Sequence, residues 1–329
     1  MRAIVRACCV LWLWLWLGTG SIVAQAQART PAVGILQVWP DTAFVERLAA
    51  FKDGLRELGL EEGRHVRFEM RSAQGRVTDL GRLAQELVDL KVDVIFAPTT
   101  AAAVAAHART REIPIVVAVA ADPVGTGLVA SLARPGGNVT GMTSNNVEIA
   151  PKRLQLLREI TGGSATRAAL LFAPNDASNL LALRLVQDAA RRLNIELRPF
   201  GLTSADELKG AFAAMRSDGI EMLVVAAGTL ADSHARAIAE LAARHRLPAI
   251  YGAPEFVEAG GLVSYSTDFV GNFRAAASFV DKILKGARPA DLPVEQSNKY
   301  LLVFNAKAAR ALGLSVPARL QLQIDRIVE

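Results

Sequence analysis

Short apolar runs alternate with helical patterns along the sequence, and the alternation occurs in two series. In the first series, the runs "VGIL", "VDVIFA" and "IPIVVAVA" are separated by segments whose apolar residues recur every three or four positions. Two such helical faces are formed by Phe44, Leu48, Phe51, Leu55 and Leu58 and by Leu80, Leu83, Leu87 and Leu90. Continuous apolar strands that alternate with amphipathic helices form parallel sheets covered on both faces. The pattern therefore predicts an α/β fold.

The second series contains the runs "RAALLFA", "IEMLVVAA" and "LPAIYGA", again separated by helical patterns. Two successive series of similar length predict two doubly wound parallel-sheet lobes. A length of 329 residues with 51% hydrophobic residues is sufficient for about two domains.

Turn residues are concentrated between the two series, in the stretch "SLARPGGNVTGMTSNN" at residues 131–146. Its Pro and Gly residues redirect the backbone, and Val139 and Thr140 favour an extended chain. We interpret Val139–Thr143, Leu262–Thr267 and Leu292–Gln296 as three hinge crossings between the lobes. The alternative, a surface loop within one domain, leaves the two similar series unexplained. The predicted first lobe comprises residues 29–141 and 266–292, and the predicted second lobe comprises 142–265 and 293–329.

The N-terminus has the three parts of a secretory signal peptide, predicted to span residues 1–28. Arg2 and Arg6 precede an apolar run over residues 7–17, and small-residue cleavage sites end at Ala26 and Ala28. A transmembrane anchor is the alternative, but the run is shorter than the roughly 20 residues that span a bilayer. The two cysteines of the sequence, Cys8 and Cys9, precede the apolar run, so no lipid-anchoring cysteine follows it. We therefore predict a free periplasmic protein that begins near Arg29.

The charge balance argues against nucleic acid as a partner. The sequence has 37 basic and 32 acidic residues, and two of the arginines lie in the predicted signal peptide. The remaining small positive charge is too low for a nucleic-acid-binding surface.

Three stretches carry a resemblance to a known family: "ADPVGTGLVASLARPGGNVTG", "YGAPEFVEAGGLVSYSTD" and "DLPVEQSNKYLLVFNAKAARALGLSVP". They resemble the ABC transporter substrate-binding protein family that includes tryptophan and tyrosine binders, and the similarity runs across nearly the whole mature chain. The resemblance implies a type I periplasmic binding-protein fold whose two lobes close over a small-molecule ligand. It also implies a permease of an ABC importer in the inner membrane as partner, and we predict a monomer. The sequence departs from lipoprotein members of the family because it lacks the lipid-anchoring cysteine.

Candidate binding residues follow from topology, because ligands of open α/β sheets bind outside the carboxyl ends of the strands. In the first lobe these positions are Gln37, Val38, Trp39, Thr99, Thr100 and Asp122. In the second lobe they are Asn175, Asp176, Ser178, Asn179, Gly228, Thr229, Tyr251 and Glu255, and Asp268 is a further candidate carboxylate.

These residue types predict a ligand that carries both charges. Thr99 and Thr100 begin a helix, so they either bind a carboxylate or serve as an ordinary N-cap. Asp122 either holds an ammonium group or fixes a turn, and Asp176, Glu255 and Asp268 are the other carboxylates that could pair with an ammonium. Trp39 and Tyr251 add aromatic surface, although a tryptophan in a loop is about as often a packing residue. We predict an amino acid or a similar small carboxylate, with an aromatic or branched side chain preferred over a sugar.

The sequence lacks the signatures of an enzyme or a metal protein. The histidines at positions 65, 107, 234 and 245 show no metal-ligand spacing. The "GTG" of residues 125–127 is only a fragment of a dinucleotide fingerprint, and no G-x-S-x-G, P-loop or H-E-x-x-H motif is present. We therefore predict a binding protein without a cofactor or metal. A sensory receptor of the same fold and a secreted α/β enzyme are the alternatives.

Overall fold

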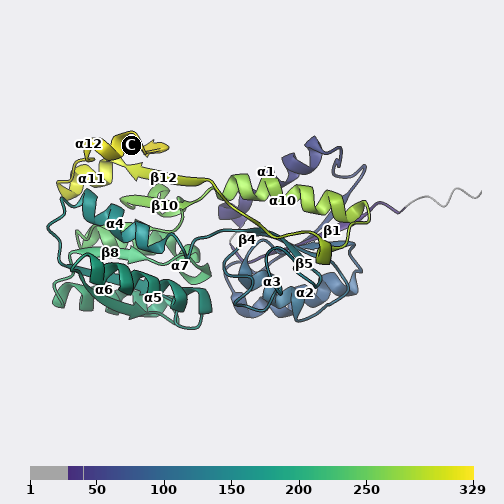
Figure 1. Cartoon of the computed structure of the whole chain (residues 1–329), viewed down its shortest axis with the longest axis horizontal. Helices are drawn as coiled ribbons and strands as arrows, with labels where there is room; N and C mark the ends of the chain where they lie inside the picture. Colours follow the sequence, from purple (N-terminus) through teal and green to yellow (C-terminus); the bar gives the residue numbers. More distant parts are fainter. Residues whose placement is uncertain (1–28, 40) are drawn as a thin grey trace, which may run out of the picture. The chain divides into compact units, whose positions relative to one another are not determined.

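The strands assemble into two sheets in the computed structural model, which describes residues 29–39 and 41–329 (Figure 1). The first sheet has the order β11-β5-β4-β3-β1-β2. Its strands are β1 (Ala32–Gln37), β2 (Arg67–Ser72), β3 (Val94–Phe96), β4 (Ile115–Ala120), β5 (Val139–Thr143) and β11 (Glu295–Gln296). The second sheet has the order β13-β12-β10-β9-β8-β6-β7. Its strands are β6 (Arg167–Phe172), β7 (Glu196–Gly201), β8 (Met222–Val225), β9 (Ala249–Tyr251), β10 (Val263–Thr267), β12 (Tyr300–Asn305) and β13 (Arg326–Val328).

Helices connect the strands of both sheets. The helices associated with the first sheet are α1 (Asp41–Glu57), α2 (Leu80–Asp89), α3 (Thr100–His107) and α10 (Phe269–Leu284). Those associated with the second sheet are α4 (Ala150–Ile160), α5 (Ala177–Arg192), α6 (Leu208–Ser217), α7 (Thr229–Ser233), α8 (Ala235–Arg244), α9 (Glu255–Glu258), α11 (Ala306–Leu312) and α12 (Ala318–Gln321). Short 3₁₀ turns occupy Val77–Asp79, Ala205–Glu207 and Pro289–Asp291. Here, a lobe means one sheet together with its helices.

The strand pairing confirms the predicted fold class. The pairs within both sheets are parallel, except for the antiparallel pair β10–β12. All residues of β1 and β4 are buried, as expected for central strands with helices on both faces. In each sheet the strand order reverses direction beside the first strand of the series, β1 or β6. This doubly wound arrangement is the one that the two series of apolar runs predict.

The chain passes between the two sheets three times, after β5, after β10 and after β11. The segments predicted as hinge crossings are thus strands of the sheets or their extensions, and the connections follow them. The predicted first crossing is a strand because its backbone pairs with neighbours on both sides. β5 is hydrogen-bonded to β4 on one side and to β11 on the other, and it is buried throughout. The predicted residue boundaries of the lobes stay a prediction.

The three connections contact one another. The Asn145 Nδ2 donates to the Ser297 carbonyl at 3.0 Å and lies 3.2 Å from the Tyr300 hydroxyl. The Thr267 hydroxyl donates to the Ser144 carbonyl. The backbone N–H of Asp268 donates to the Lys299 carbonyl at 3.0 Å. Side-chain and backbone donors therefore tie the first, second and third connections into one hydrogen-bonded hinge.

Gly141 in β5 is required by a close backbone approach. Its φ is +129°, and a Cβ built on it would lie 2.1 Å from the Val117 carbonyl oxygen of β4. The β4–β5 pairing shifts register between Val117 and Ala120, which indicates a bulge at this point. Only a residue without a side chain fits here.

The helices α1 and α10 lie side by side on the first sheet although some 200 residues separate them in sequence (Figure 1). Gly54 permits the contact, because a Cβ at this position would lie 2.6 Å from the Arg274 carbonyl oxygen. The C-terminal part of the chain therefore completes the first lobe through α10.

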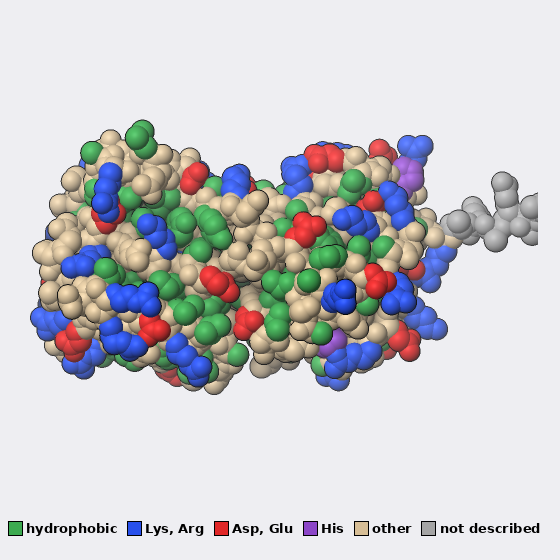
Figure 2. Space-filling view, in the orientation of Figure 1, with side chains coloured by type: hydrophobic (Ala, Val, Ile, Leu, Met, Phe, Trp, Pro, Cys, Tyr) green, Lys and Arg blue, Asp and Glu red, His purple; other side chains and the backbone are tan. Residues whose placement is uncertain are grey.

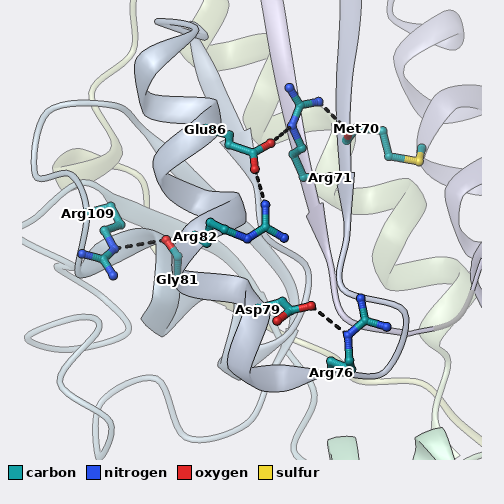
Figure 3. A network of polar contacts seen from close by, with 8 residues as sticks. All are labelled: Met70, Arg71, Arg76, Asp79, Gly81, Arg82, Glu86 and Arg109. Atoms are coloured by element: carbon teal, nitrogen blue, oxygen red, sulfur yellow. Dashed lines mark hydrogen bonds and ion pairs between the residues drawn. The ribbon is translucent and has the colours of Figure 1, made fainter.

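Polar contacts link β2, α2 and the 3₁₀ turn that joins them (Figure 3). The Glu86 carboxylate accepts from Arg71 Nε of the edge strand β2 at 2.7 Å and from Arg82. Arg76 Nε donates to Asp79 at 2.8 Å, and Arg109 Nε donates to the Gly81 carbonyl at 3.1 Å. The Arg76–Asp79 pair therefore spans the 3₁₀ turn, and Glu86 ties α2 to the edge strand β2.

Charged side chains of both signs are interspersed on the face seen in Figure 2. Among the described residues, no helix combines the length and the apolar character that a bilayer crossing requires. The predicted signal peptide lies outside the described residues.

Candidate functional site

A cleft of about 730 Å³ lies between the carboxyl edges of the two sheets. This volume lies within the range of about 300–1,000 Å³ typical of small-molecule sites. The first lobe contributes the loop after β1, the 3₁₀ turn before α2, the start of α3 and the start of α10. The second lobe contributes the loop after β6, the start of α5 and the α7 segment.

The predicted residues that line this cleft are Trp39, Thr99, Thr100, Asn175, Asp176, Ser178, Gly228 and Thr229. These residues follow the carboxyl ends of strands, where ligands of such sheets bind. The fold brings the residues of the first lobe and those of the second lobe to the same cleft.

The N-terminus of α3 presents hydrogen-bond donors to the cleft. The Thr99 hydroxyl accepts from the Ala102 N–H at 3.2 Å, which is an N-cap. The Thr100 hydroxyl accepts from the Ala121 N–H at 2.8 Å and ties α3 to the end of β4. Both hydroxyls are thus engaged within the protein, and the first-turn N–H groups at the positive end of the helix remain suited to an anion.

The N-terminus of α5 faces the same cleft but carries its own negative charge. Asp176 accepts from the Ser178 N–H at 2.9 Å and from the Ser178 hydroxyl at 2.6 Å. Asp176 therefore neutralises the positive end of α5, which makes this helix a poorer anion site than α3.

Several predicted residues lie outside the cleft lining because contacts within the protein engage them. Asn179 accepts from Ala173 N–H at 3.0 Å and donates to the Ala227 carbonyl at 2.9 Å, so it braces the loops after β6 and β8. Asp122 accepts from the Gly125 N–H at 2.8 Å and fixes a turn. Asp268 caps α10 through the Gly271 N–H at 2.9 Å and pairs with Lys299 at 2.8 Å.

Four further predicted residues, Gln37, Val38, Tyr251 and Glu255, are also outside the cleft lining. Gln37, Val38 and Tyr251 are fully buried, and the ring of Tyr251 stacks on Phe256 with centroids 4.6 Å apart. Burial raises the pKa of the Tyr251 phenol. Glu255 forms an ion pair with Arg47 of α1. The geometry therefore does not support the predicted ligand contacts of these residues, nor those of Asn179, Asp122 and Asp268.

Asp232 of α7 lines the cleft, although it was not predicted as a binding residue from the sequence. Although the residue as a whole is only partly buried, its Oδ1 atom is buried and has no hydrogen-bond partner. Burial raises the pKa of this carboxyl to about 6, and attraction to Arg47 and Arg153 opposes the rise. A buried carboxylate oxygen without a donor is a site for a cationic group.

Arg153 of α4 is the other charged residue of the cleft that the sequence did not indicate. Its guanidinium is fully buried and donates to the Tyr265 carbonyl at 2.7 Å and to the Asn146 carbonyl at 3.0 Å and Oδ1 at 2.5 Å. Burial lowers its pKa to about 10, so it stays charged at neutral pH. Because three acceptors of the protein engage it, Arg153 mainly supports the hinge and adds positive potential near Asp232.

The apolar part of the cleft lies mostly in the first lobe. It includes Trp39, Val77, Leu80, Val104, Val119 and Phe269, together with Val147, Leu202 and Leu230 of the second lobe. A separate apolar cavity of about 20 Å³ borders the cleft near Leu202 and Leu230. That volume accommodates about one methyl-sized group, so a large ligand side chain fits the main cleft only.

The comparisons with known proteins identify the family. The family model described as "ABC transporter substrate binding protein" matches residues 32–328. The chain belongs to this family. Family members bind solutes and are not enzymes, and the described residues contain no group of three or more His, Cys, Asp or Glu that could hold a metal ion.

Individual relatives are similar over most of their length. A tyrosine-binding protein of Clostridioides difficile is 26% identical over 282 residues, which cover 86% of this chain and 81% of that protein. A conserved domain protein of Vibrio cholerae has a structure with a TM-score of 0.83 and 26% identity, covering 91% of this chain and 100% of that chain. The structure of an ABC domain of Streptococcus pneumoniae in complex with L-Trp has a TM-score of 0.85 and 24% identity, with the same coverage of 91% and 100%. These matches confirm the predicted family and fold.

Proposed function

We propose that the protein is the periplasmic substrate-binding component of an ABC importer and binds one amino acid with an aromatic or branched side chain. Asp232 is the main observation behind the ligand class: it lines a cleft that also contains a helix N-terminus and an apolar surface, and its Oδ1 atom is buried without a hydrogen-bond partner. A free amino acid presents an ammonium group, a carboxylate and a side chain, and each has a matching region here.

The charged groups of the ligand would bind on opposite lobes. Asp232 of the second lobe accepts the ammonium group, and the first-turn N–H groups of α3, next to Thr99 and Thr100, bind the carboxylate. Such a ligand would bridge the lobes, because α3 belongs to the first lobe and α7 to the second. A ligand that contacts both lobes favours the arrangement in which the lobes are closed around it.

The side chain of the ligand would lie against the apolar surface of the first lobe. Trp39 and Phe269 provide two aromatic rings there, and Val104 and Val119 provide aliphatic surface. Aromatic pairs contribute roughly 0.5–1.5 kcal/mol beyond the area that they bury. The name of the clostridial relative, a tyrosine-binding protein, and the L-Trp complex of the streptococcal relative support this preference.

The cellular setting rests on the sequence. Arg2 and Arg6, the apolar run after them and the small residues near Ala26 and Ala28 are typical of a cleaved signal peptide. The mature protein would begin near Arg29, act as a monomer in the periplasm and deliver its ligand to a permease in the inner membrane.

Calorimetric titration of the purified chain 29–329 with single L-amino acids and with sugars tests the proposal. We expect binding of an aromatic or branched amino acid, and we expect Asp232→Asn to weaken it by about 30-fold or more, because the ammonium group then loses its charged partner. Asp188→Asn is the matched control, since the Asp188 side chain of α5 is 47% exposed and pairs with Arg191 at the surface. Binding of sugars alone, or equal affinities of the Asp232→Asn variant and the unchanged protein, would contradict the proposal.

A further inference from the structure

Arg47 of α1 lies behind the two aromatic rings of the cleft without lining the cleft itself. It is only 5% exposed. Its guanidinium carbon lies 4.5 Å from the ring centroid of Trp39 and 4.7 Å from that of Phe269. Both distances are within the range of cation–π contacts. We call these two rings, which come from the loop after β1 and from the start of α10, the aromatic wall.

The guanidinium of Arg47 also contacts the other lobe. It forms an ion pair with Glu255, the first residue of α9, and α9 packs on β10 and β12 of the second sheet. Arg47 belongs to α1, which packs on α10 of the first lobe. A single buried side chain thus contacts the aromatic wall in one lobe and a carboxylate in the other.

We infer that Arg47 is a positioning residue of the binding site, which orients the aromatic wall for the ligand side chain and, through Glu255, links that wall to lobe closure. The role in ligand choice rests on the proposed function, whereas the link between the lobes does not.

Two physical arguments support this assignment. The planar guanidinium stacks on aromatic faces, which a lysine ammonium group cannot do in the same way. Burial of Arg47 lowers its pKa to about 10, so it remains charged and needs a partner when the lobes meet. Glu255 is the ion-pair partner of Arg47, and Asp232 of the second lobe also attracts its charge. Removing Glu255 therefore takes away the hydrogen-bonded partner of a buried cation and favours separated lobes.

Two phenylalanines also pack against Trp39, and neither of them contacts Phe269 in the way that Arg47 does. Trp39 lies 6.1 Å from Phe44 and 6.3 Å from Phe273 between ring centroids. These phenylalanines fix the position of the tryptophan from the protein interior. On the side of Arg47, the guanidinium is the group that joins Trp39 to Phe269.

Trp39 provides a direct optical readout, because it is the single tryptophan of residues 29–329. Selective excitation of this tryptophan with acrylamide quenching measures its accessibility in the protein without ligand. We expect Glu255→Gln to increase the quenching constant by about twofold, since the lobes separate more often. The matched control is Glu57→Gln, which breaks an exposed ion pair with Arg274 inside the first lobe, between α1 and α10, and should leave quenching unchanged.

Ligand selectivity separates the two roles of Arg47. We expect Glu255→Gln to weaken binding of L-Tyr and L-Leu by the same factor, because it changes closure and leaves the aromatic wall in place. Arg47→Lys keeps the charge and loses the planar stacking, so it should reduce the preference for L-Tyr over L-Leu by about threefold or more. Circular dichroism and thermal unfolding verify that each variant is folded.

Two results would overturn the inference. One is equal quenching of Trp39 in the Glu255→Gln and Glu57→Gln variants, which refutes the link between the lobes even if no amino acid binds. The other is an unchanged ratio of L-Tyr to L-Leu affinities in Arg47→Lys, which refutes the orienting role while leaving the proposed function intact.

Discussion

Lowering the pH from 7 to 5 should weaken amino-acid binding by about tenfold, because it protonates Asp232. The pKa of this carboxyl in the free protein is raised to about 6 by burial. A bound ammonium group stabilises the charged carboxylate, so the complex has the lower pKa and binding releases a proton in acid. Affinity is therefore nearly full at pH 7 and above, and it falls as the pH drops through about 6.

The magnitude follows from the fraction of charged carboxylate. With a pKa of about 6, about nine in ten free molecules carry the charge at pH 7 and about one in ten at pH 5. The dissociation constant should rise about tenfold over this interval, which is about 1.4 kcal/mol. Each further pH unit below 5 should cost about another factor of ten as long as the complex keeps Asp232 charged.

The other charged groups near Asp232 do not produce the same curve. Arg47 of α1 and Arg153 of α4 have pKa values lowered to about 10, so both stay protonated from pH 5 to pH 7. Asp176, before α5, repels Asp232 and contributes to the raised pKa. His234 also lines the cleft close to Asp232, so its substitution serves as the control.

Calorimetric titrations at pH 7, 6 and 5, in two buffers of different ionisation enthalpy, measure both the affinity and the protons released. Asp232→Asn should bind weakly at pH 7 with a flat pH profile, whereas His234→Gln should keep the profile of the unchanged protein. A dissociation constant of the unchanged protein that is equal at pH 7 and pH 5 would refute the assignment of Asp232. The same conclusion would follow if His234→Gln, and not Asp232→Asn, abolished the pH dependence.

Three further predictions follow from the sequence and structure. Asp232→Asn should stabilise the ligand-free protein at pH 7 by up to about 2–3 kcal/mol, because a raised acid pKa lowers stability as the pH rises through 4 to 6; thermal unfolding at pH 7 and pH 4 tests this, and a loss of stability at pH 7 would contradict it. Gly141→Ala should destabilise the protein by about 3 kcal/mol, since its Cβ would overlap the Val117 carbonyl, whereas Gly137→Ala meets open space and should be nearly neutral in denaturant unfolding. N-terminal sequencing of protein released by osmotic shock should find a start at or near Arg29, and recovery only with detergent would count against export as a free protein.

The sequence was sufficient to predict the strands and the helices between them. The spacing of apolar residues in each segment reflects which side of that segment is buried. Phe44, Phe51 and Leu55 of α1 are buried as predicted. Leu48 is partly buried, and Leu58 and Leu90 are exposed, by 42% and 41%. The helices end at Glu57 and Asp89, one residue before each leucine, so the last member of each apolar series falls beyond the helix and turns away from the core.

The candidate site could be predicted in position but only partly in its residues. The carboxyl ends of the strands do border the cleft, and Trp39, Thr99 and Asn175 follow such ends. Asp122 and Asp268 occupy equivalent positions and are engaged by N–H groups of the turn or helix that follows. Short acidic side chains commonly serve as caps at such positions, and sequence position alone does not distinguish a cap from a ligand contact.

The missed residues reach the cleft from helices. Arg153 lies in the first half of α4, and its side chain extends toward acceptors on the hinge and on β10. Asp232 lies four residues after Gly228 and points into the cleft from α7. Their direction depends on how a helix packs on its sheet, which is a tertiary property. Asn146, by contrast, belongs to the turn-rich stretch at residues 131–146, whose composition did indicate an unusual segment.

Two aspartates of the second lobe border the same cleft, and their hydrogen bonds assign them different roles. Asp176 accepts two hydrogen bonds from Ser178, so donors of the protein already stabilise its charge. Asp232 Oδ1 has no such donor, and burial raises its pKa to about 6. Arg47, Arg153 and the Gly228 N–H partly stabilise the charge of Asp232, but its Oδ1 atom still lacks a hydrogen bond. A cation that enters the cleft therefore gains more at Asp232 than at Asp176, whose charge Ser178 already satisfies. Under the proposed function, this asymmetry favours a ligand with a single ammonium group, whose carboxylate would then point toward α3.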